Sequence, residues 1–258
     1  MSAHLEVSGV SLAFGGLKAL DDCSFTVPKG RVTCLSGPNG AGKTTVFDVI
    51  TGFLRPDAGG VAFRGRPLNG LSPAARVSAG IARTFQDLRL FAEMSVRDNV
   101  VACLPEAADS GLTASLLRPV RAHRGLRARQ ARAAEILDGV GLGHKIDAAV
   151  TSLSYGQQKL LCIARVLATG AEMLLLDEPT SGLSQQALHD MVAAVERLKA
   201  SGHTLLIVEH NTRMVTRIAD EIVFLHRGHA LRQGSPQAIL SDPELAEIYF
   251  GGVTGTAR

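Results

Sequence analysis

The chain has 258 residues, of which 46% are hydrophobic, so it can bury a full core without the help of disulfides. Its formal net charge of +3 does not by itself indicate a nucleic-acid-binding protein. The N-terminus has no basic stretch followed by an apolar run, and no apolar run approaches the roughly 20 residues of a membrane span. We therefore expect neither a secretory signal nor a segment that crosses a membrane.

Strand patterns fill the first part of the chain. Residues 5–14 alternate loosely between apolar and polar side chains, and residues 23–27 end at a proline and glycine turn signal. Residues 31–37 form a short apolar run that ends in glycine, whereas residues 43–53 place apolar side chains at helical spacing. After another turn, residues 61–65 alternate again. We expect an N-terminal antiparallel β subdomain here.

Helical sequence, rich in alanine and arginine, runs from about residue 88 to residue 168. Two candidate buried strands follow, at 171–179 and 203–210, with the helical pattern of residues 185–202 between them. Residues 221–234 resemble a closing hairpin. Because strands alternate with helices, we expect an α/β fold with a mainly parallel sheet, in which residues 88–168 form an inserted helical subdomain. The interpretation is a single domain over 1–258 with a C-terminal tail from about 236 to 258.

One glycine-rich segment matches the phosphate-loop pattern G-x-x-x-x-G-K-[ST]. A buried strand precedes it and a helix follows it, which disfavours a ligand-free turn. The glycines let the backbone point its N–H groups at phosphate oxygens, the helix start adds its positive dipole end, and Lys43 adds a full charge. Thr44 can place a hydroxyl on Mg²⁺. We predict that the nucleotide is bound by Gly37, Pro38, Asn39, Gly40, Ala41, Gly42, Lys43, Thr44 and Thr45.

Two acids end the buried strand that begins near Met173. Open α/β sheets bind ligands at the carboxyl edge of their strands, where Asp177 and Glu178 would lie. Asp177 is suited to hold Mg²⁺, and Glu178 is suited to orient or deprotonate a water that attacks the γ-phosphate. A solvated strand end is the alternative, which the nearby phosphate loop disfavours. Gln86 and His210 have no clear role from their own surroundings.

These motifs occur together in a familiar order. The phosphate loop, the glutamine of "RTFQ", the segment "LSYGQQ", the "LLLDEP" strand end and "VEH" follow one another at the spacings of an ABC-type ATPase domain. The chain resembles that family over essentially its whole length. The resemblance implies ATP and Mg²⁺ as cofactors, and a phosphate-loop NTPase core with the antiparallel and helical subdomains described above.

The resemblance also assigns roles to residues. Phe14 stands where such domains carry an aromatic side chain that stacks on adenine. Gln86 corresponds to the glutamine that touches Mg²⁺ and the attacking water, Glu178 to the catalytic base, and His210 to the histidine that braces the γ-phosphate. The metal would be held by Thr44, Gln86 and Asp177. The signature motif, which reads the ATP of a second subunit, would be Ser154, Gly156 and Gln157.

Two positions depart from the family pattern. Tyr155 replaces the first glycine of the signature motif, which is tolerable if its side chain points outward. Ser184 stands where the family usually carries Asp or Asn, in a loop that contacts the opposite subunit, so we expect weaker coupling between two ATP sites. Ser154 and Gln157 also have the S-x-x-Q spacing of a helix capping box.

The finer resemblance is to the ATP-binding subunit of branched-chain amino acid importers, and importers of urea or amides share much of the pattern. It implies two transmembrane permease subunits, a second ATP-binding subunit (the same chain or a paralogue) and, indirectly, a solute-binding protein. It implies a cytoplasmic location, peripheral on the membrane. A soluble ABC ATPase of the cofactor-assembly type and an exporter subunit remain alternatives. Residues 71–152 are too short for the coiled coils of DNA-repair relatives.

An arginine-rich segment at residues 118–132 contains six arginines and no acid. It fits a solvated helix face, or a face that contacts anionic lipid headgroups on the cytoplasmic side of a membrane. No aromatic side chain interrupts it, so we expect no nucleic acid as a partner.

Overall fold

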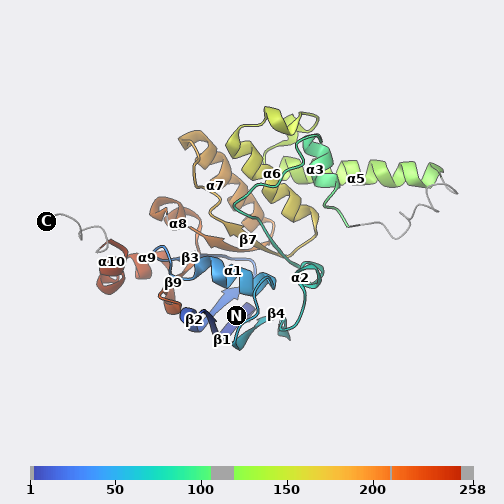
Figure 1. Cartoon of the computed structure of the whole chain (residues 1–258). Helices are drawn as coiled ribbons and strands as arrows, with labels where there is room; N and C mark the ends of the chain where they lie inside the picture. Colours follow the sequence, from blue (N-terminus) through green and yellow to red (C-terminus); the bar gives the residue numbers. More distant parts are fainter. Residues whose placement is uncertain (1–2, 106–118, 210, 251–258) are drawn as a thin grey trace. The chain divides into compact units, whose positions relative to one another are not determined.

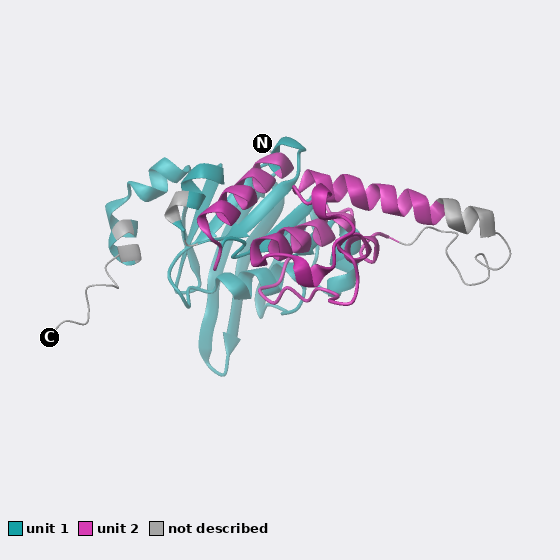
Figure 2. Ribbon diagram, turned by 90° about the horizontal axis from the view of Figure 1, so that it is seen from above, with its two compact units in different colours: residues 1–83, 172–181, 199–258 teal, residues 84–171, 182–198 magenta. Residues whose placement is uncertain are grey.

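The computed structural model describes residues 3–105, 119–209 and 211–250. The chain divides into two compact units (Figure 2). Unit 1 comprises residues 1–83, 172–181 and 199–258, and unit 2 comprises residues 84–171 and 182–198.

Unit 1 is built on two sheets (Figure 1). The first is antiparallel, with the order β2-β1-β4-β5. The second has six strands in the order β10-β9-β3-β8-β7-β6, of which all but β10 are parallel to their neighbours. The strands are β1 (Ala3–Phe14), β2 (Leu17–Pro28), β3 (Val32–Ser36), β4 (Ala58–Phe63), β5 (Arg66–Pro67), β6 (Ile81–Arg83), β7 (Met173–Asp177), β8 (Thr204–Val208), β9 (Glu221–His226) and β10 (His229–Gly234). The expected α/β fold with a parallel sheet and an antiparallel sheet is confirmed.

The central strands β3, β7 and β8 are buried along their whole length, as their continuous apolar sequences require. Helix α1 contacts both β2 and β6, so its apolar face joins the two sheets in one core. Phe47 and Ile50 on α1 are fully buried there. The helices of this unit are α1 (Lys43–Thr51), α2 (Pro73–Ala79), α8 (Thr212–Ile218), α9 (Pro236–Leu240) and α10 (Pro243–Phe250).

Helices dominate unit 2. Helix α3 contacts both α5 and α6, and α5 also contacts α6. Val100, Leu137 and Leu161 are fully buried, one from each of these helices. The elements are α3 (Val96–Val101), α5 (Pro119–Gly139), the short 3₁₀ helices η1 (Gly143–Lys145) and η2 (Val150–Ser152), α6 (Tyr155–Ala168) and most of α7 (Gln185–Ala200). Over residues 3–105, 119–209 and 211–250, none of the helices has the length and apolar character needed to cross a membrane.

The arginine-rich segment has one member with a defined structural task. Arg118 lies outside the described residues, whereas the rest of the segment belongs to α5. The guanidinium of Arg129 donates to the carbonyl of Val101 at 2.8 Å and to that of Leu104 at 3.1 Å. Val101 is the last residue of α3 and Leu104 lies in the turn that follows, so Arg129 ties α5 to the C-terminal end of α3. At least this arginine is therefore not a purely solvated charge.

A buried histidine near the N-terminus lies beside the start of β7. His4 is 4% exposed, its ring packs edge-on against Phe63, and its Nε2 lies 3.9 Å from a carboxylate oxygen of Glu172. Burial lowers the pKa of His4; Glu172 opposes this shift, whereas Lys29 and Arg64 reinforce it. The folded chain therefore holds this imidazole in its neutral form more strongly than the unfolded chain does.

We expect this histidine to make the fold less stable in mild acid. Because the folded-state pKa of His4 lies below the unfolded value of 6.5, the unfolded chain binds more protons as the pH falls through that value. The melting temperature of the wild type should fall more between pH 7.5 and pH 5.5 than that of His4→Gln. The exposed His189, changed to glutamine, is the control. An equal fall in the melting temperatures of wild type and His4→Gln between these two pH values would contradict the prediction.

Candidate functional site

The phosphate loop connects β3 to α1 and depends on two glycines with left-handed backbone. Gly37 has φ 142°, and a Cβ there would lie 2.0 Å from the carbonyl oxygen of Leu225. Gly42 has φ 103°, and a Cβ there would lie 2.7 Å from the carbonyl oxygen of Ala19. No other residue fits either position. The loop is thus wrapped tightly against β2 and β9 just before the start of α1.

Lys43 is folded back over this loop. Its Nζ donates to the carbonyl oxygens of Gly37 and Pro38, both at 2.8 Å. Burial lowers the pKa of Lys43, and the carboxylates of Glu178 and Asp177 act in the opposite direction. The lysine and the two acids therefore lie within electrostatic reach of one another in unit 1, as the sequence motifs predict.

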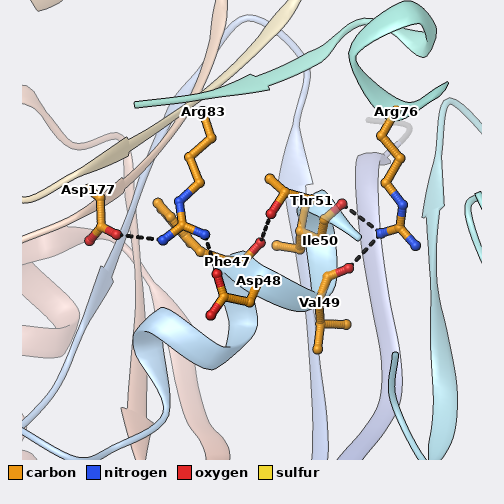
Figure 3. Close-up of polar contacts among 8 residues, drawn as sticks. All are labelled: Phe47, Asp48, Val49, Ile50, Thr51, Arg76, Arg83 and Asp177. Carbon is orange, nitrogen blue, oxygen red and sulfur yellow. Dashed lines mark hydrogen bonds and ion pairs between the residues drawn. The ribbon is translucent and has the colours of Figure 1, made fainter. Parts of the chain in front are cut away.

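Asp177, the last residue of β7, is held by an arginine that the sequence motifs do not include (Figure 3). Arg83 donates through Nη2 to Oδ2 of Asp177 at 2.8 Å, and its Nη1 pairs with Asp48 on α1. Burial raises the pKa of Asp177, whereas Arg83 lowers it through its hydrogen bond and its charge. No local periodicity in the sequence identifies Arg83, because β6 has only three residues.

Glu178 sits in an unusual backbone conformation. It has φ 45°, in the left-handed region that residues with a side chain seldom adopt. Its N–H donates to the carbonyl oxygen of Val208 on β8, and its own carbonyl accepts from the N–H of Ser181. The half-buried side chain thus leaves the end of β7 at a bend, and the backbone hydrogen bonds to Val208 and Ser181 fix this bend. Strain of this kind concentrates at functional sites.

A second acid, Glu209, is fully buried beside this bend. Its Oε1 accepts hydrogen bonds from both the N–H of Thr180, at 3.0 Å, and the hydroxyl of the same residue. Glu209 thereby ties the loop after β7 to the loop after β8. The signal for it was present in the sequence as a carboxylate at the end of the apolar run 204–208. His210, the next residue, lies outside the described residues.

The signature motif begins α6 in unit 2. Ser154 accepts from the N–H of Gln157 at 3.3 Å, and the Gln157 side chain accepts from the N–H of Ser154 at 3.0 Å, which confirms the predicted capping box. Tyr155, which replaces the first glycine of the signature motif, is 48% exposed. The exposure agrees with the expectation that its side chain points outward. Gly156 is needed for close packing, because a Cβ there would lie 2.6 Å from Cβ of Ala187.

The remaining predicted site residues are divided between the two units. In unit 1, Phe14 ends β1 with half of its surface exposed, and Thr44 is exposed in the first turn of α1. In unit 2, Gln86 is exposed in the segment between β6 and α3. The roles of these residues, and of the signature motif, stay predictions.

The oxygen donors of unit 1 fit a magnesium ion. Mg²⁺ in nucleotide sites uses one or two carboxylates or hydroxyls together with phosphate oxygens. Thr44, an exposed residue that directly follows Lys43, and the Asp177 carboxylate, which interacts electrostatically with Lys43, supply such a set.

Comparison with known proteins identifies the family. The ABC transporter family model matches residues 20–181. The chain belongs to the ABC transporter family. It is 36% identical to a high-affinity branched-chain amino acid transport ATP-binding protein of Pseudomonas aeruginosa, BraF, over 96% of this chain and 97% of that protein. A probable branched-chain amino acid transport ATP-binding protein of Methanocaldococcus jannaschii, LivG, is also 36% identical, over 96% of this chain and 97% of that protein.

Solved structures agree with this ABC transporter assignment. A nucleotide-free ATP-binding cassette from an ABC transporter has a TM-score of 0.82 and 34% identity, and the similarity covers 96% of this chain and 99% of that one. The ADP conformation of such a cassette also has a TM-score of 0.82, over 97% of this chain and 100% of that one. The fold of this ABC protein is therefore that of an ATP-binding ATPase domain.

Proposed function

We propose that the chain is the ATP-hydrolysing subunit of an ABC importer for branched-chain amino acids or a related small solute, such as urea or an amide. The observation that carries the proposal is the phosphate loop with two acids beside it, in a chain 36% identical over 96% of its length to a branched-chain amino acid transport ATP-binding protein. This likeness favours import over the cofactor-assembly and exporter alternatives. The transported solute itself would not touch this subunit.

The residues of unit 1 divide the chemistry among them. The loop backbone and Lys43 bind the phosphates of ATP and offset their charge. Glu178, fixed at the bend after β7, orients a water molecule for attack on the γ-phosphate and accepts its proton. Thr44 and Asp177 would hold Mg²⁺, which when bound supplies charge neutralisation on the β- and γ-phosphates.

The functional unit in this proposal is a pair of ATP-binding subunits, which are two copies of this chain or this chain and a paralogue. Ser154, Gly156 and Gln157 would read the γ-phosphate of an ATP bound on the opposite subunit, because a capped helix start presents N–H groups and a hydroxyl to an anion. ATP can favour the closed pair because its γ-phosphate makes contacts that ADP cannot make. Two permease subunits would receive the motion near Gln86, on the cytoplasmic face of the membrane.

Reconstitution tests the proposal directly. The chain would be co-expressed with the two permeases of a branched-chain amino acid importer, purified and placed in liposomes with the matching solute-binding protein. We expect ATP hydrolysis to rise when leucine, isoleucine or valine is supplied on the binding-protein side, and urea and short amides are the comparison solutes. Failure of the chain to co-purify with any permease would favour the cofactor-assembly alternative.

The unusual Ser184 gives a prediction about cooperativity. Ser184 directly precedes α7, and its Oγ accepts from the N–H of Ala187 in the first turn at 3.4 Å. Aspartate is an equally good N-cap, so Ser184→Asp should fold normally. We expect it to raise the Hill coefficient of ATP hydrolysis, because the carboxylate restores the charge usual in this loop. Gln185→Asp, which adds the same charge one residue later, is the control, and an unchanged coefficient in Ser184→Asp would contradict the idea.

A further inference from the structure

Arg83 connects the first helix of the nucleotide site to the acid at the end of β7 (Figure 3). Its two terminal nitrogens contact different carboxylates, Nη2 that of Asp177 at 2.8 Å and Nη1 that of Asp48. The side chains of Arg83 and Asp177 are 7% and 6% exposed. The acids are 129 positions apart in the sequence, so only the folded chain brings them to the same guanidinium.

The contact uses properties that only arginine has. A guanidinium is a rigid planar fork, and it can bind two carboxylates in fixed directions, whereas a lysine ammonium is a single point charge. The plane also packs near the ring of Phe47 on α1, with Cζ 5.4 Å from the ring centroid. The position of the guanidinium is thus set by α1 on one side, and it sets the rotation of the Asp177 carboxylate on the other.

Both ends of this connection belong to the nucleotide site. Asp48 and Phe47 lie on α1, the helix that the phosphate loop begins, and Asp177 is the predicted metal ligand of β7. Arg83 is also the last residue of unit 1 before the chain enters unit 2, three positions before Gln86. A carboxylate that binds a metal beside ATP has to keep its orientation, and partners behind a metal ligand provide it.

We infer that Arg83 is a positioning residue for the metal site: it holds the Asp177 carboxylate in a fixed orientation relative to α1, so that ATP gains affinity when Mg²⁺ accompanies it. This inference rests on the proposed function, since it assumes an ATP site that uses Mg²⁺. The competing view is that Arg83 only stabilises the fold.

Arg76 on α2 offers a matched control, because it is another buried arginine and its guanidinium donates to backbone carbonyls, including two of α1 (Figure 3). Its Nη1 donates to the carbonyl of Ile50 at 2.8 Å and also to that of Val49, which are carbonyls of the last turn of α1. Loss of this contact should lower the stability of the fold. It should not change how strongly Mg²⁺ improves nucleotide binding.

The test measures binding of a non-hydrolysable ATP analogue by calorimetry, once in excess EDTA and once in excess Mg²⁺, on the full chain. For Arg83→Lys we expect near wild-type affinity in EDTA and a reduction of roughly 10-fold in the gain that Mg²⁺ provides. For Arg76→Lys we expect a lower melting temperature and the same Mg²⁺-dependent gain in affinity as in the wild type. Asp48→Asn, which removes one anchor and keeps the Arg83–Asp177 contact, should lose part of the gain.

Two results would overturn the inference. One is an unchanged Mg²⁺-dependent gain in Arg83→Lys, and the other is an equal loss of affinity in EDTA and in Mg²⁺, which a structural role predicts. If Arg83→Lys does not fold, Asp48→Asn decides, and a full gain in that variant overturns the inference. If the affinity of the wild type for the ATP analogue does not depend on Mg²⁺, both the inference and the proposed function are wrong. If the wild type shows the Mg²⁺-dependent gain and Arg83→Lys keeps it, only the inference is wrong.

Discussion

Glu178→Gln should bind ATP normally and hydrolyse it at least about 100-fold more slowly than the wild type. The amide keeps the shape of the side chain and can adopt the same left-handed backbone at φ 45°, but it cannot accept a proton from the attacking water. Because the γ-phosphate then persists, pairs of subunits closed around ATP should accumulate. Phosphate release measures the first effect, and size-exclusion chromatography in ATP and Mg²⁺ measures the second.

Glu172→Gln is the matched control for this experiment. Glu172 directly precedes β7, at the opposite end from Glu178, and its side chain is 48% exposed. The Glu172→Gln variant should hydrolyse ATP at the wild-type rate. Hydrolysis by Glu178→Gln at a normal rate would remove Glu178 from the mechanism, and loss of ATP binding would show that the substitution acts on the site as a whole.

Ser154→Arg should also abolish hydrolysis while ATP binding to the single chain remains. The arginine removes the cap on α6, at a cost of about 1 kcal/mol, and places a long charged side chain where the second subunit's γ-phosphate would approach. Closure of the pair would be blocked, whereas the phosphate loop of unit 1 would be intact. Nucleotide binding, hydrolysis and dimer formation are measured on the same preparation.

The control separates the lost cap from the blocked pair. Ser235 is also an exposed N-cap serine, of α9, and accepts from the N–H of Ala238 at 3.3 Å. Ser235→Arg should cost similar stability and leave hydrolysis unchanged. Normal hydrolysis by Ser154→Arg would mean that the signature motif does not act across a pair of subunits.

Most of the site was predictable because its parts are local. The phosphate loop, the acids that end β7 and the capping box of α6 each depend on a few neighbouring residues, whose types encode the backbone that they form. The strands β3, β7 and β8 were equally readable, since continuous apolar runs indicate strands buried on both faces. The three-residue β6 and the seven-residue α2 carry too little periodicity to be predicted.

The sequence by itself therefore determined the family pattern, the phosphate loop and the position of Glu178, the proposed catalytic base. Only the tertiary structure decided what holds these parts in place: Arg83 between Asp48 and Asp177, and Glu209 on Thr180. The physical reason is that such contacts depend on which strands become neighbours. The pairing of β6 with β7 and of β7 with β8 joins segments far apart in the chain, and no local pattern in one sequence encodes that choice.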